Sequence, residues 1–519
     1  MTDTPSPLPS VMASAEAFPT LTPSQVARIT LYGRKRLMSQ AEVLIESGET
    51  PTRFFVVNSG QIEAVRQSCK GEELVAIIGP GMFTGEITLL SGRRGLVQIR
   101  AREPGEVIEV DRERLRALVQ TDSDLSDTLM RAFILRRVEL ISHGFGDVVL
   151  VGSSHSAGTL RIKEFLTRND HPYSFIDLER DTGVQDLLDH FHVAVEDVPV
   201  LICRGEVVLR NPSNEQIADC LGFNEVINPS QVRDVVVVGA GPAGLAAAVY
   251  AASEGLDILV LESNSPGGQA ASSSKIENYL GFPTGISGQE LAARAYTQAQ
   301  KFGAQMIIAK HAKQLICERR PYAVEIDTGE QIAARTVIIA TGAEYRRLSI
   351  ENLSQFEGNG VYYGATFIEA QLCTGEEVVI VGGGNSAGQA AVFLAQTAKR
   401  VYVVVRAKGL AESMSRYLIR RLERTPNIDL LPQTEIVAME GTDRLQRISL
   451  RDNQTGQIET KQIGHLFAMT GAVPSTGWLN DCVALNQKGF IKTGPDLSPD
   501  DLDTAQWPLA RAPYLLETS

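Results

Sequence analysis

Two glycine-rich turns in the second half of the chain have the residue types that bind a dinucleotide. The first, Gly239-Ala240-Gly241-Pro242-Ala243-Gly244, follows the apolar run 234–238 and opens an Ala-rich stretch. Such glycines permit a tight turn and a close approach of the backbone to a diphosphate at a helix N-terminus. The next apolar run ends in Glu262, whose type and spacing suit ribose hydroxyls. Strand, turn, helix, strand and acid in this order predict a dinucleotide site.

The second turn, Gly382-Gly383-Gly384-Asn385-Ser386-Ala387, follows the apolar run 377–381 and also opens an Ala-rich stretch. The run after it, 400–405, ends in Arg406, with Lys408 nearby and no acid. Cations at this place favour a 2′-phosphate, so the pattern predicts NADPH rather than NADH; a solvated basic turn is the alternative. Two nucleotide folds in one chain predict hydride transfer from a nicotinamide to a flavin.

The stretch from about Val232 to the chain end resembles low-molecular-weight thioredoxin reductases and the related flavoprotein subunits of alkyl hydroperoxide reductases. The further motifs that carry the resemblance are Gly267-Gly268-Gln269, Glu277-Asn278-Tyr279, Gly288-Gln289-Glu290-Leu291 and Ala340-Thr341-Gly342 with Arg346. The resemblance implies an FAD-binding domain at 232–346 and 471–519, an NAD(P)H-binding domain at 347–470, and a homodimer. It implies FAD contacts from Gly239, Gly241, Gly244, Glu262, Gly268, Gln269, Asn278, Ala340, Thr341 and Gly342. It implies nicotinamide-cofactor contacts from Gly382, Gly384, Asn385, Ser386, Ala387 and Arg406.

Two departures from this family limit what carries over. The family's redox-active cysteine pair falls on Gly364 and Phe367, so a relay from flavin to disulfide through that pair is chemically impossible. Cys373 is the thiol nearest in sequence; core packing is its favoured interpretation and a catalytic role the alternative, with Glu369 as a candidate proton donor. The family's last strand and helix are expected after Ser519, so we expect an FAD pocket that is open on one side.

The first segment, 18–142, has short apolar runs between polar turns, which predict a β-roll with flanking helices. Within it, Gly81 to Arg94 resembles the phosphate-binding cassette of cyclic-nucleotide-binding domains, which implies ligand contacts from Gly85 and Glu86. The family's phosphate-binding arginine falls on Gly95, so Arg94 would have to reach the site through a one-residue shift. The alternatives are a cyclic nucleotide, another anionic ligand, and a sensor-like domain that binds nothing.

The second segment, 147–223, resembles the thioredoxin/glutaredoxin fold through its β-α-β, β-β-α order. Pro199 matches that family's cis-proline. The active C-x-x-C is replaced by 156–159, or by 153–156 if the register slips, and neither stretch contains a thiol. We therefore expect a non-redox adaptor, a peptide-binding module or a spacer.

The totals agree with a multidomain globular chain: a β-roll, a thioredoxin-like α/β module and two Rossmann-like α/β domains. A length of 519 residues corresponds to about three to four domains. The net charge of −13 argues against a nucleic-acid partner, and no apolar run is long enough to cross a membrane. Residues 1–17 are polar and lack the basic start of a secretory signal, so we expect a disordered tail on a cytoplasmic protein.

The six cysteines have neither C-x-x-C nor zinc-ligand spacing, which predicts no metal site and isolated, mostly buried thiols in a reducing compartment. The sequence thus predicts a flavin-dependent oxidoreductase, in which electrons pass from NADPH to FAD and then to an external, unknown acceptor. The N-terminal domains would regulate it. The alternative is a non-catalytic nucleotide or redox sensor, and a disulfide reductase that uses a partner's thiols is the weakest of the three.

Overall fold

The computed structural model describes residues 16–68, 71–86, 88–142, 148–154, 156–178, 197–203, 207–479 and 482–519. Most of the predicted disordered tail, residues 1–15, lies outside the described residues, as do linker residues 143–147. Ala17 was wrongly assigned to that tail. It is fully buried, and its carbonyl accepts a hydrogen bond from Arg136 Nε at 2.8 Å, so the first domain begins before Phe18.

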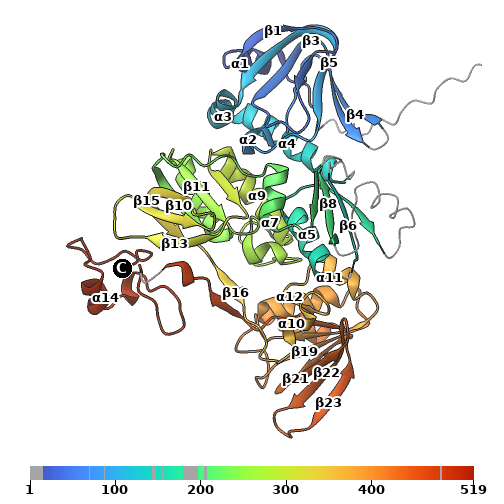
Figure 1. Cartoon of the computed structure of the whole chain (residues 1–519), viewed down its shortest axis with the longest axis vertical. Helices are drawn as coiled ribbons and strands as arrows, with labels where there is room; N and C mark the ends of the chain where they lie inside the picture. The colour runs from blue at the N-terminus through green and yellow to red at the C-terminus, as the bar shows by residue number, and fades with distance from the viewer. Residues whose placement is uncertain are drawn as a thin grey trace, which may run out of the picture.

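The N-terminal domain (16–142) is the predicted β-roll with flanking helices (Figure 1). Its strands pair antiparallel in the order β1-β5-β3-β4, with β2 also on β5. The elements are α1 (Pro23–Thr30), β1 (Arg34–Met38), β2 (Val43–Ile45), β3 (Arg53–Ser68), β4 (Gly71–Ile78), α2 (Thr88–Ser91), β5 (Gln98–Asp111), α3 (Arg112–Thr121) and α4 (Ser123–Ser142).

The helical stretch after the β-roll is broken into two helices, α3 and α4. Asp122 between them has extended backbone (φ −116°, ψ 100°), and its carboxylate accepts from the Leu125 N–H at 3.1 Å. An aspartate that caps a new helix start in this way competes with helix continuation. The break was readable from the Thr-Asp-Ser sequence at 121–123 but was hidden by the apolar pattern on both sides.

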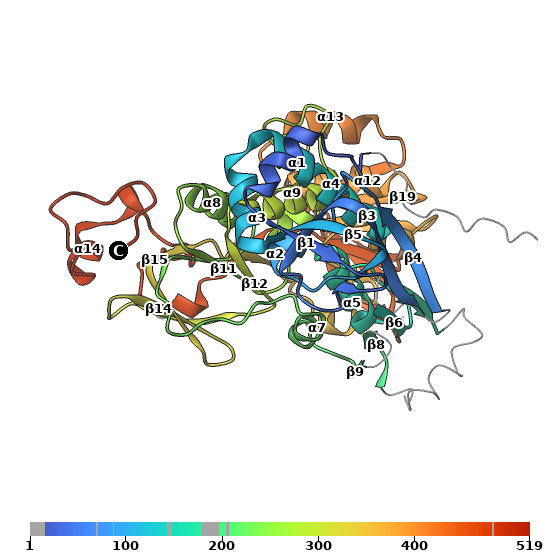
Figure 2. The ribbon, with the colours of Figure 1, turned by 90° about the horizontal axis from the view of Figure 1, so that it is seen from above.

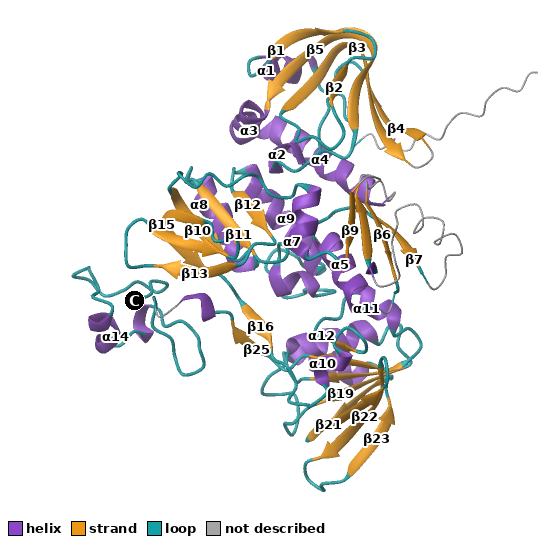
Figure 3. Ribbon diagram, in the orientation of Figure 1, coloured by secondary structure: helices purple, strands orange, loops and turns teal. Residues whose placement is uncertain are grey.

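The middle module (148–223) is a four-stranded sheet in the order β7-β6-β8-β9, with β6 parallel to β7 and antiparallel to β8 (Figure 3). The Val198–Pro199 peptide bond is cis, as the resemblance implies. Cys203 is fully buried in the module's core, as predicted. The elements are β6 (Val148–Gly152), α5 (Ala157–Arg168), β7 (Ser174–Asp177), β8 (Val200–Cys203), β9 (Val207–Arg210) and α7 (Asn214–Leu221).

The first α/β domain surrounds the first glycine turn. Its six-stranded sheet has the order β12-β11-β10-β15-β14-β13, in which β12, β11, β10 and β15 are parallel. Strand β11 is buried along its whole length, which is why its sequence is continuously apolar up to Glu262. The elements are β10 (Arg233–Val238), α8 (Pro242–Ser253), β11 (Ile258–Glu262), η2 (Gly268–Ser272), α9 (Gly288–Lys301), β12 (Gln305–Ile308), β13 (Ala312–Ile316), β14 (Tyr322–Ile326) and β15 (Gln331–Ile339).

The second α/β domain surrounds the second turn. Its parallel sheet has the order β17-β24-β18-β19-β20, and a three-stranded meander, β21-β22-β23, packs beside it. The antiparallel pair β16–β25 forms the two connections to the first α/β domain. The elements are β16 (Ala343–Tyr345), α10 (Leu353–Phe356), β17 (Val361–Tyr362), α11 (Phe367–Leu372), β18 (Glu377–Val381), α12 (Asn385–Leu394), β19 (Arg400–Val404), α13 (Arg416–Arg424), β20 (Ile428–Leu431), β21 (Thr434–Gly441), β22 (Leu445–Asp452), β23 (Ile458–Gln462), β24 (His465–Ala468) and β25 (Ala472–Pro474).

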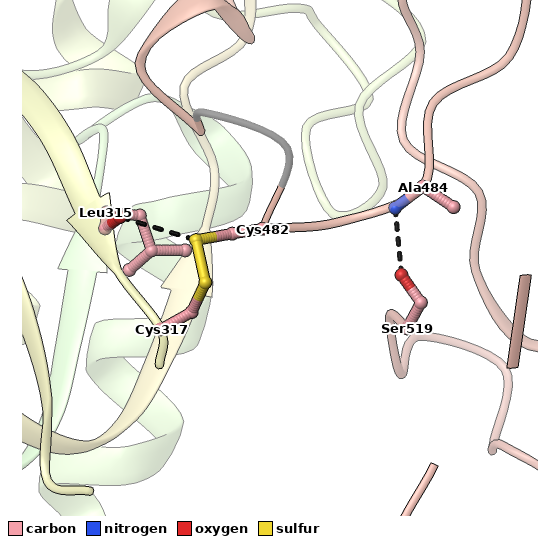
Figure 4. The surroundings of a disulfide bond; sticks show 5 residues. All are labelled: Leu315, Cys317, Cys482, Ala484 and Ser519. Carbon is pink, nitrogen blue, oxygen red and sulfur yellow. Dashed lines mark hydrogen bonds between the residues drawn. A yellow bond between two sulfur atoms is a disulfide. The ribbon is translucent and has the colours of Figure 1, made fainter. Parts of the chain in front are cut away.

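The last segment holds η3 (Gly477–Leu479), η4 (Gly494–Asp496) and α14 (Pro499–Thr504), and α14 lies at the margin of the molecule (Figure 2). Cys482 in this segment forms a disulfide with Cys317, just after β13 (Figure 4). The expectation that every cysteine is isolated was wrong for this pair. The two residues are 165 positions apart, so no spacing rule could have joined them. Within the described residues, no helix has the length and apolar content that a membrane crossing requires; the cytoplasmic location stays a prediction.

Reduction of the Cys317–Cys482 bond is expected to destabilise the first α/β domain. A cross-link that closes a loop of this length removes conformational freedom from the unfolded chain, and such bonds contribute roughly 2–5 kcal/mol. We therefore expect dithiothreitol to lower the unfolding temperature of the native protein but not that of Cys317→Ser/Cys482→Ser. Equal effects on both proteins would show that the bond does not form in solution.

Candidate active site

The first glycine turn is closed toward the protein and open toward solvent. A Cβ on Gly239 (φ +103°) would lie 2.3 Å from the Ala340 carbonyl oxygen, and one on Gly244 would lie 1.8 Å from the Gly239 oxygen. At Gly241, which caps the N-terminus of α8, a Cβ would meet nothing within 4 Å. The turn thus presents bare backbone N–H groups beside empty space, as a diphosphate site requires.

Glu262 at the end of β11 is held against this turn. Its Oε2 accepts from the Ala240 N–H at 2.7 Å, and its Oε1 accepts from the Asn264 N–H at 2.9 Å. Burial raises the pKa of the Glu262 carboxyl, while these two N–H groups favour its charged form. The predicted ribose-binding acid is therefore fixed in place before any ligand arrives.

A cleft of about 1040 Å³ joins the first turn to both neighbouring domains. It brings together most of the residues predicted to contact FAD: Gly239, Gly241, Glu262, Gly268, Gln269, Ala340, Thr341 and Gly342. Gly244 lies inside the turn instead, and Asn278 lies exposed on a loop outside this cleft.

Sequence reasoning missed several residues that line the cleft. Tyr345 and Tyr363 stack with ring centroids 6.2 Å apart and together form part of its wall, and Trp478 lines it from the C-terminal segment. The face of α5 in the middle module also lines it, through Ala157, Leu160, Arg161, Glu164 and Arg168. No local pattern could have indicated these residues, because they come from different domains.

The second glycine turn has the same construction. A Cβ on Gly382 (φ +146°) would lie 2.2 Å from the Met469 oxygen, and Gly384 caps the N-terminus of α12. The predicted contact Asn385 is already engaged, since its Oδ1 accepts from the Ser415 N–H at 2.7 Å. Ser386 is exposed, whereas Ala387 is fully buried and has only its backbone to offer. Arg406 and Lys408 lie exposed beyond the end of β19, where a 2′-phosphate would be expected.

The N-terminal domain contains a cavity of about 70 Å³ beside Gly85 and Glu86, with room for roughly five water molecules. Gly95 and Leu96 line it where the cyclic-nucleotide family has its arginine. The predicted shift of Arg94 into this site was wrong: its guanidinium points to the middle module and donates to the Cys220 carbonyl at 3.3 Å. The Arg94 side chain packs directly against Gly222, which has no Cβ and so leaves room for it.

Two cations that sequence reasoning missed line this cavity, Arg53 of β3 and the more deeply buried Arg136 of α4. Arg136 is 4% exposed, donates to the Gly85 carbonyl at 2.7 Å and lies over the Phe18 and Phe83 rings. Burial lowers the pKa of Arg136 to about 9. Because Arg136 lies on the helix after the roll, 51 positions from Gly85, no cassette motif includes it.

Residues 233–501 match the family described as pyridine nucleotide-disulphide oxidoreductase, which is more than half of the chain. The chain belongs to this family. Residues 35–122 of the oxidoreductase also match the cyclic nucleotide-binding domain. The prediction of an FAD-dependent NAD(P)H oxidoreductase with an N-terminal cyclic-nucleotide-type domain is confirmed at this level.

The oxidoreductase is 34% identical over 268 residues to a thioredoxin reductase of Ureaplasma parvum, a match that covers 51% of this chain and 85% of the relative. It is 32% identical over 269 residues to the thioredoxin reductase of Bacillus subtilis, with 51% and 83% covered. Among solved structures, the thioredoxin reductase of T. acidophilum matches at 28% identity with a TM-score of 0.48, covering 50% of this chain and 84% of that one. Family members named thioredoxin reductase use FAD and NADPH, the two cofactors predicted here.

Helix α11 borders the cleft and carries the candidate proton donor that the sequence predicted. Glu369 lines the cleft, and its Oε2 accepts from the Thr366 N–H at 2.8 Å and from the Thr366 hydroxyl. Burial raises the pKa of the Glu369 carboxyl, so this residue both caps the helix and stays a candidate proton donor. Cys373 is fully buried in the core of the second α/β domain and does not line the cleft. The structure therefore supports core packing rather than a catalytic role for Cys373.

Replacing Cys373 with alanine is expected to leave turnover within about twofold of the parent oxidoreductase. Burial raises the pKa of the Cys373 thiol to about 11, so little thiolate exists near neutral pH to react with anything. The measurement is NADPH oxidation with an artificial acceptor, alongside a denaturant melt, because loss of a buried sulfur costs some stability. A loss of turnover with an unchanged melt would restore Cys373 as a catalytic residue.

Proposed function

We propose that this chain oxidises NADPH and passes the two electrons through FAD directly to an external acceptor. The net reaction is NADPH, a proton and the acceptor giving NADP⁺ and the two-electron-reduced acceptor. The observation that carries the proposal is the pair of glycine turns, each at a helix N-terminus, in a chain that has glycine and phenylalanine at 364 and 367. Bound FAD would supply the hydride and electron chemistry. Among the described residues that line the cleft there is no cysteine, so the acceptor would have to come to the cleft.

The chain's own residues would bind and orient the cofactors. The backbone N–H groups after Gly241 would hold the FAD diphosphate, and Glu262 would accept from ribose hydroxyls. The N-terminus of α12 would hold the nicotinamide-cofactor diphosphate, with Arg406 on the 2′-phosphate. Glu369 is the proposed proton donor at the cleft, because its burial favours the protonated form.

We further propose that the middle module is a thioredoxin-like fold without redox activity. Its strand order and its cis Val198–Pro199 bond support this assignment. The domain boundaries at 142, 147, 223 and 232, the homodimer and the cytoplasmic location are kept as proposals from the sequence. Light scattering of the purified chain tests the dimer.

Regulation by the N-terminal domain is proposed from its contacts with residues 169–170, at the corner after α5. Arg93 donates to the Asn169 carbonyl at 2.8 Å and lies over the Phe223 ring, and Arg137 donates to the Asp170 carbonyl at 3.1 Å. Arg137 also lies 3.9 Å from Glu86 at the cavity. A ligand that moves Glu86 would therefore act on the corner through Arg137. The cavity lining is mostly apolar, and Gly95 stands where the family has its phosphate-binding arginine, so a cyclic nucleotide is one of several candidate ligands.

The contacts of this corner suggest a test of the regulatory role. We expect Arg93→Gln/Arg137→Gln to change turnover at least threefold, with Arg131→Gln on the exposed side of α4 as the control. An unchanged rate in the double variant contradicts coupling through the corner.

Anaerobic titration tests the main proposal against the second candidate, a non-catalytic sensor. The protein should bind added FAD, and NADPH should bleach the visible flavin band before an acceptor restores it. Flavin that binds without bleaching favours the sensor. A protein that binds no FAD contradicts the proposed function.

A further inference from the structure

Helix α5 of the middle module forms a wall of the flavin cleft. The residues on its cleft side follow helical spacing and are Ala157, Leu160, Arg161, Glu164 and Arg168. Its other side, with Ile162 and Phe165, packs on the module's own sheet. In Figure 1, α5 lies between the first α/β domain and α11 of the second. The middle module thus contributes residues to the lining of the cleft.

Several direct contacts fix the module in this position. Asn224 exchanges two hydrogen bonds with the Ile308 backbone at 2.8 and 2.7 Å. Lys310 pairs with Glu215 at 2.5 Å, and Gln289 of α9 donates to the Thr167 carbonyl at 3.1 Å. Ile308 itself belongs to the module's core cluster. A shared core and these side-chain hydrogen bonds and ion pair hold α5 beside the first α/β domain.

Arg168, the last residue of α5, reaches across to the family's Gly-Gly-Gln turn. Its Nη2 donates to the Gly268 carbonyl at 2.5 Å, and its Nη1 pairs with Glu164 at 3.0 Å. Its Nε is buried and has no hydrogen-bond partner among the described residues. A Cβ on Gly268 would lie 3.1 Å from the Gly241 Cα, so the guanidinium stands beside the open side of the first turn. Burial raises the pKa of the Glu262 carboxyl, and the positive charge of Arg168 partly offsets this rise.

The cleft needs positive charge that the first α/β domain does not supply alone. A diphosphate brings about two negative charges next to Glu262, and backbone N–H groups compensate only part of them. Among the described residues that line the cleft, Lys310 is already paired with Glu215, and Arg161 donates to Asn214 and the Pro212 carbonyl. Arg168 lines the cleft, and its Nη1 is paired with Glu164, which is 41% exposed, so a diphosphate can replace that pairing at little cost.

We propose that the middle module completes the FAD site, with Arg168 as a guanidinium ligand of the FAD diphosphate. This inference rests on the proposed function, since it requires FAD in the cleft. It gives the thioredoxin-like module, which has no C-x-x-C pair, a role in holding the cofactor. It also places the N-terminal domain's contacts at 169–170 directly beside a cofactor ligand.

Titration of flavin-free protein with FAD, followed by flavin fluorescence, tests the inference. Arg168→Gln should raise the FAD Kd roughly 10- to 100-fold, as expected for loss of a charge-assisted hydrogen bond. Arg168→Lys should fall between the two, because it keeps the charge but loses the planar fork. The matched control is Arg210→Gln in β9 of the same module, which pairs with Asp197 away from this cleft and should bind like the parent.

A readout of the diphosphate itself separates binding from folding. ADP should raise the unfolding temperature of the parent protein more than that of Arg168→Gln, while adenosine should act on both equally. If the parent binds no FAD, the proposed function fails as well. If the parent binds FAD and Arg168→Gln binds it equally well, only this inference is overturned. If Arg168→Gln unfolds at a lower temperature than the parent, Arg168→Lys decides instead. Its FAD Kd must then be higher than that of the parent, and an equal Kd overturns the inference.

Discussion

Gly241→Ala is expected to lose FAD affinity by about 10- to 100-fold while the protein stays as stable as the parent. The new Cβ would meet nothing within 4 Å in the protein, and the backbone there (φ −70°, ψ −177°) suits any residue. The space that the methyl group fills is the space a diphosphate needs when it approaches the turn. Stability should therefore change by less than about 0.5 kcal/mol, as for a surface substitution.

Gly244→Ala is the contrasting variant in the same turn. Its Cβ would lie 1.8 Å from the Gly239 oxygen, so the turn and the start of α8 have to move. We expect this variant to lose both FAD and stability. Gly79→Ala in the N-terminal domain, where the nearest atom is Met82 Sδ at 4.0 Å, should change neither.

Flavin content per protein and a thermal melt distinguish these three variants. A Gly241→Ala protein that retains FAD with the parent's affinity would mean that the diphosphate lies elsewhere, and the site assigned to the first turn would be wrong. A Gly241→Ala protein that melts early would mean that the turn is not open in solution. The pair Gly241 and Gly244 thus separates a glycine needed for the ligand from a glycine needed for the fold.

The features that sequence alone predicted are those in which chemistry and local structure coincide. The first glycine turn, the helix it opens and Glu262 lie within about 30 consecutive residues, and so do the second turn, its helix and Arg406. One crossover unit therefore contains both the motif and its scaffold. Pro199 was predictable for a similar reason, because a proline before a strand carries its own backbone constraint. Both inferences needed nothing from a distant part of the chain.

The features that sequence could not predict are contacts between residues that are remote along the chain. Arg136 lines the N-terminal cavity from a helix that follows the roll and donates to the Gly85 carbonyl. Arg94 points away from the cavity and donates to the Cys220 carbonyl of the middle module. Cys317 and Cys482 meet only once the sheet and the last segment have packed. In each case the side chain's role is decided by which domain stands next to it, and composition and periodicity do not record that.

The same distinction explains why the cleft is larger than its motifs. The two α/β domains account for the glycine turns, but α5 and the Tyr345–Tyr363 stack complete the walls. In the proposed direct transfer, the acceptor would enter past these residues, since positions 364 and 367 offer no thiol to carry electrons outward. Specificity for the acceptor is therefore expected to depend on α5 and the Tyr345–Tyr363 stack rather than on the two glycine turns.

Replacing the two cations after β19 is expected to weaken the preference for NADPH over NADH. Arg406 and Lys408 are exposed, and within the described part of the chain neither side chain is seen in a hydrogen bond or an ion pair, so Arg406→Gln/Lys408→Gln should fold normally. A guanidinium binds a phosphate through two parallel hydrogen bonds, and losing it removes roughly 1.5–3 kcal/mol of binding. The KM for NADPH should rise about 10- to 100-fold, whereas the KM for NADH, which has no 2′-phosphate, should change less than twofold.

Anaerobic flavin reduction at varied cofactor concentration measures this directly. Arg447→Gln on β22 is the control, because that arginine pairs with Glu440 on the meander and should affect neither cofactor. Added salt should raise the KM for NADPH in the parent more steeply than in the double variant, since screening acts on the same charge pair that the substitutions remove. If the double variant keeps the parent's KM for NADPH, the basic turn is merely solvated, and the 2′-phosphate must be held by residues elsewhere in the second α/β domain.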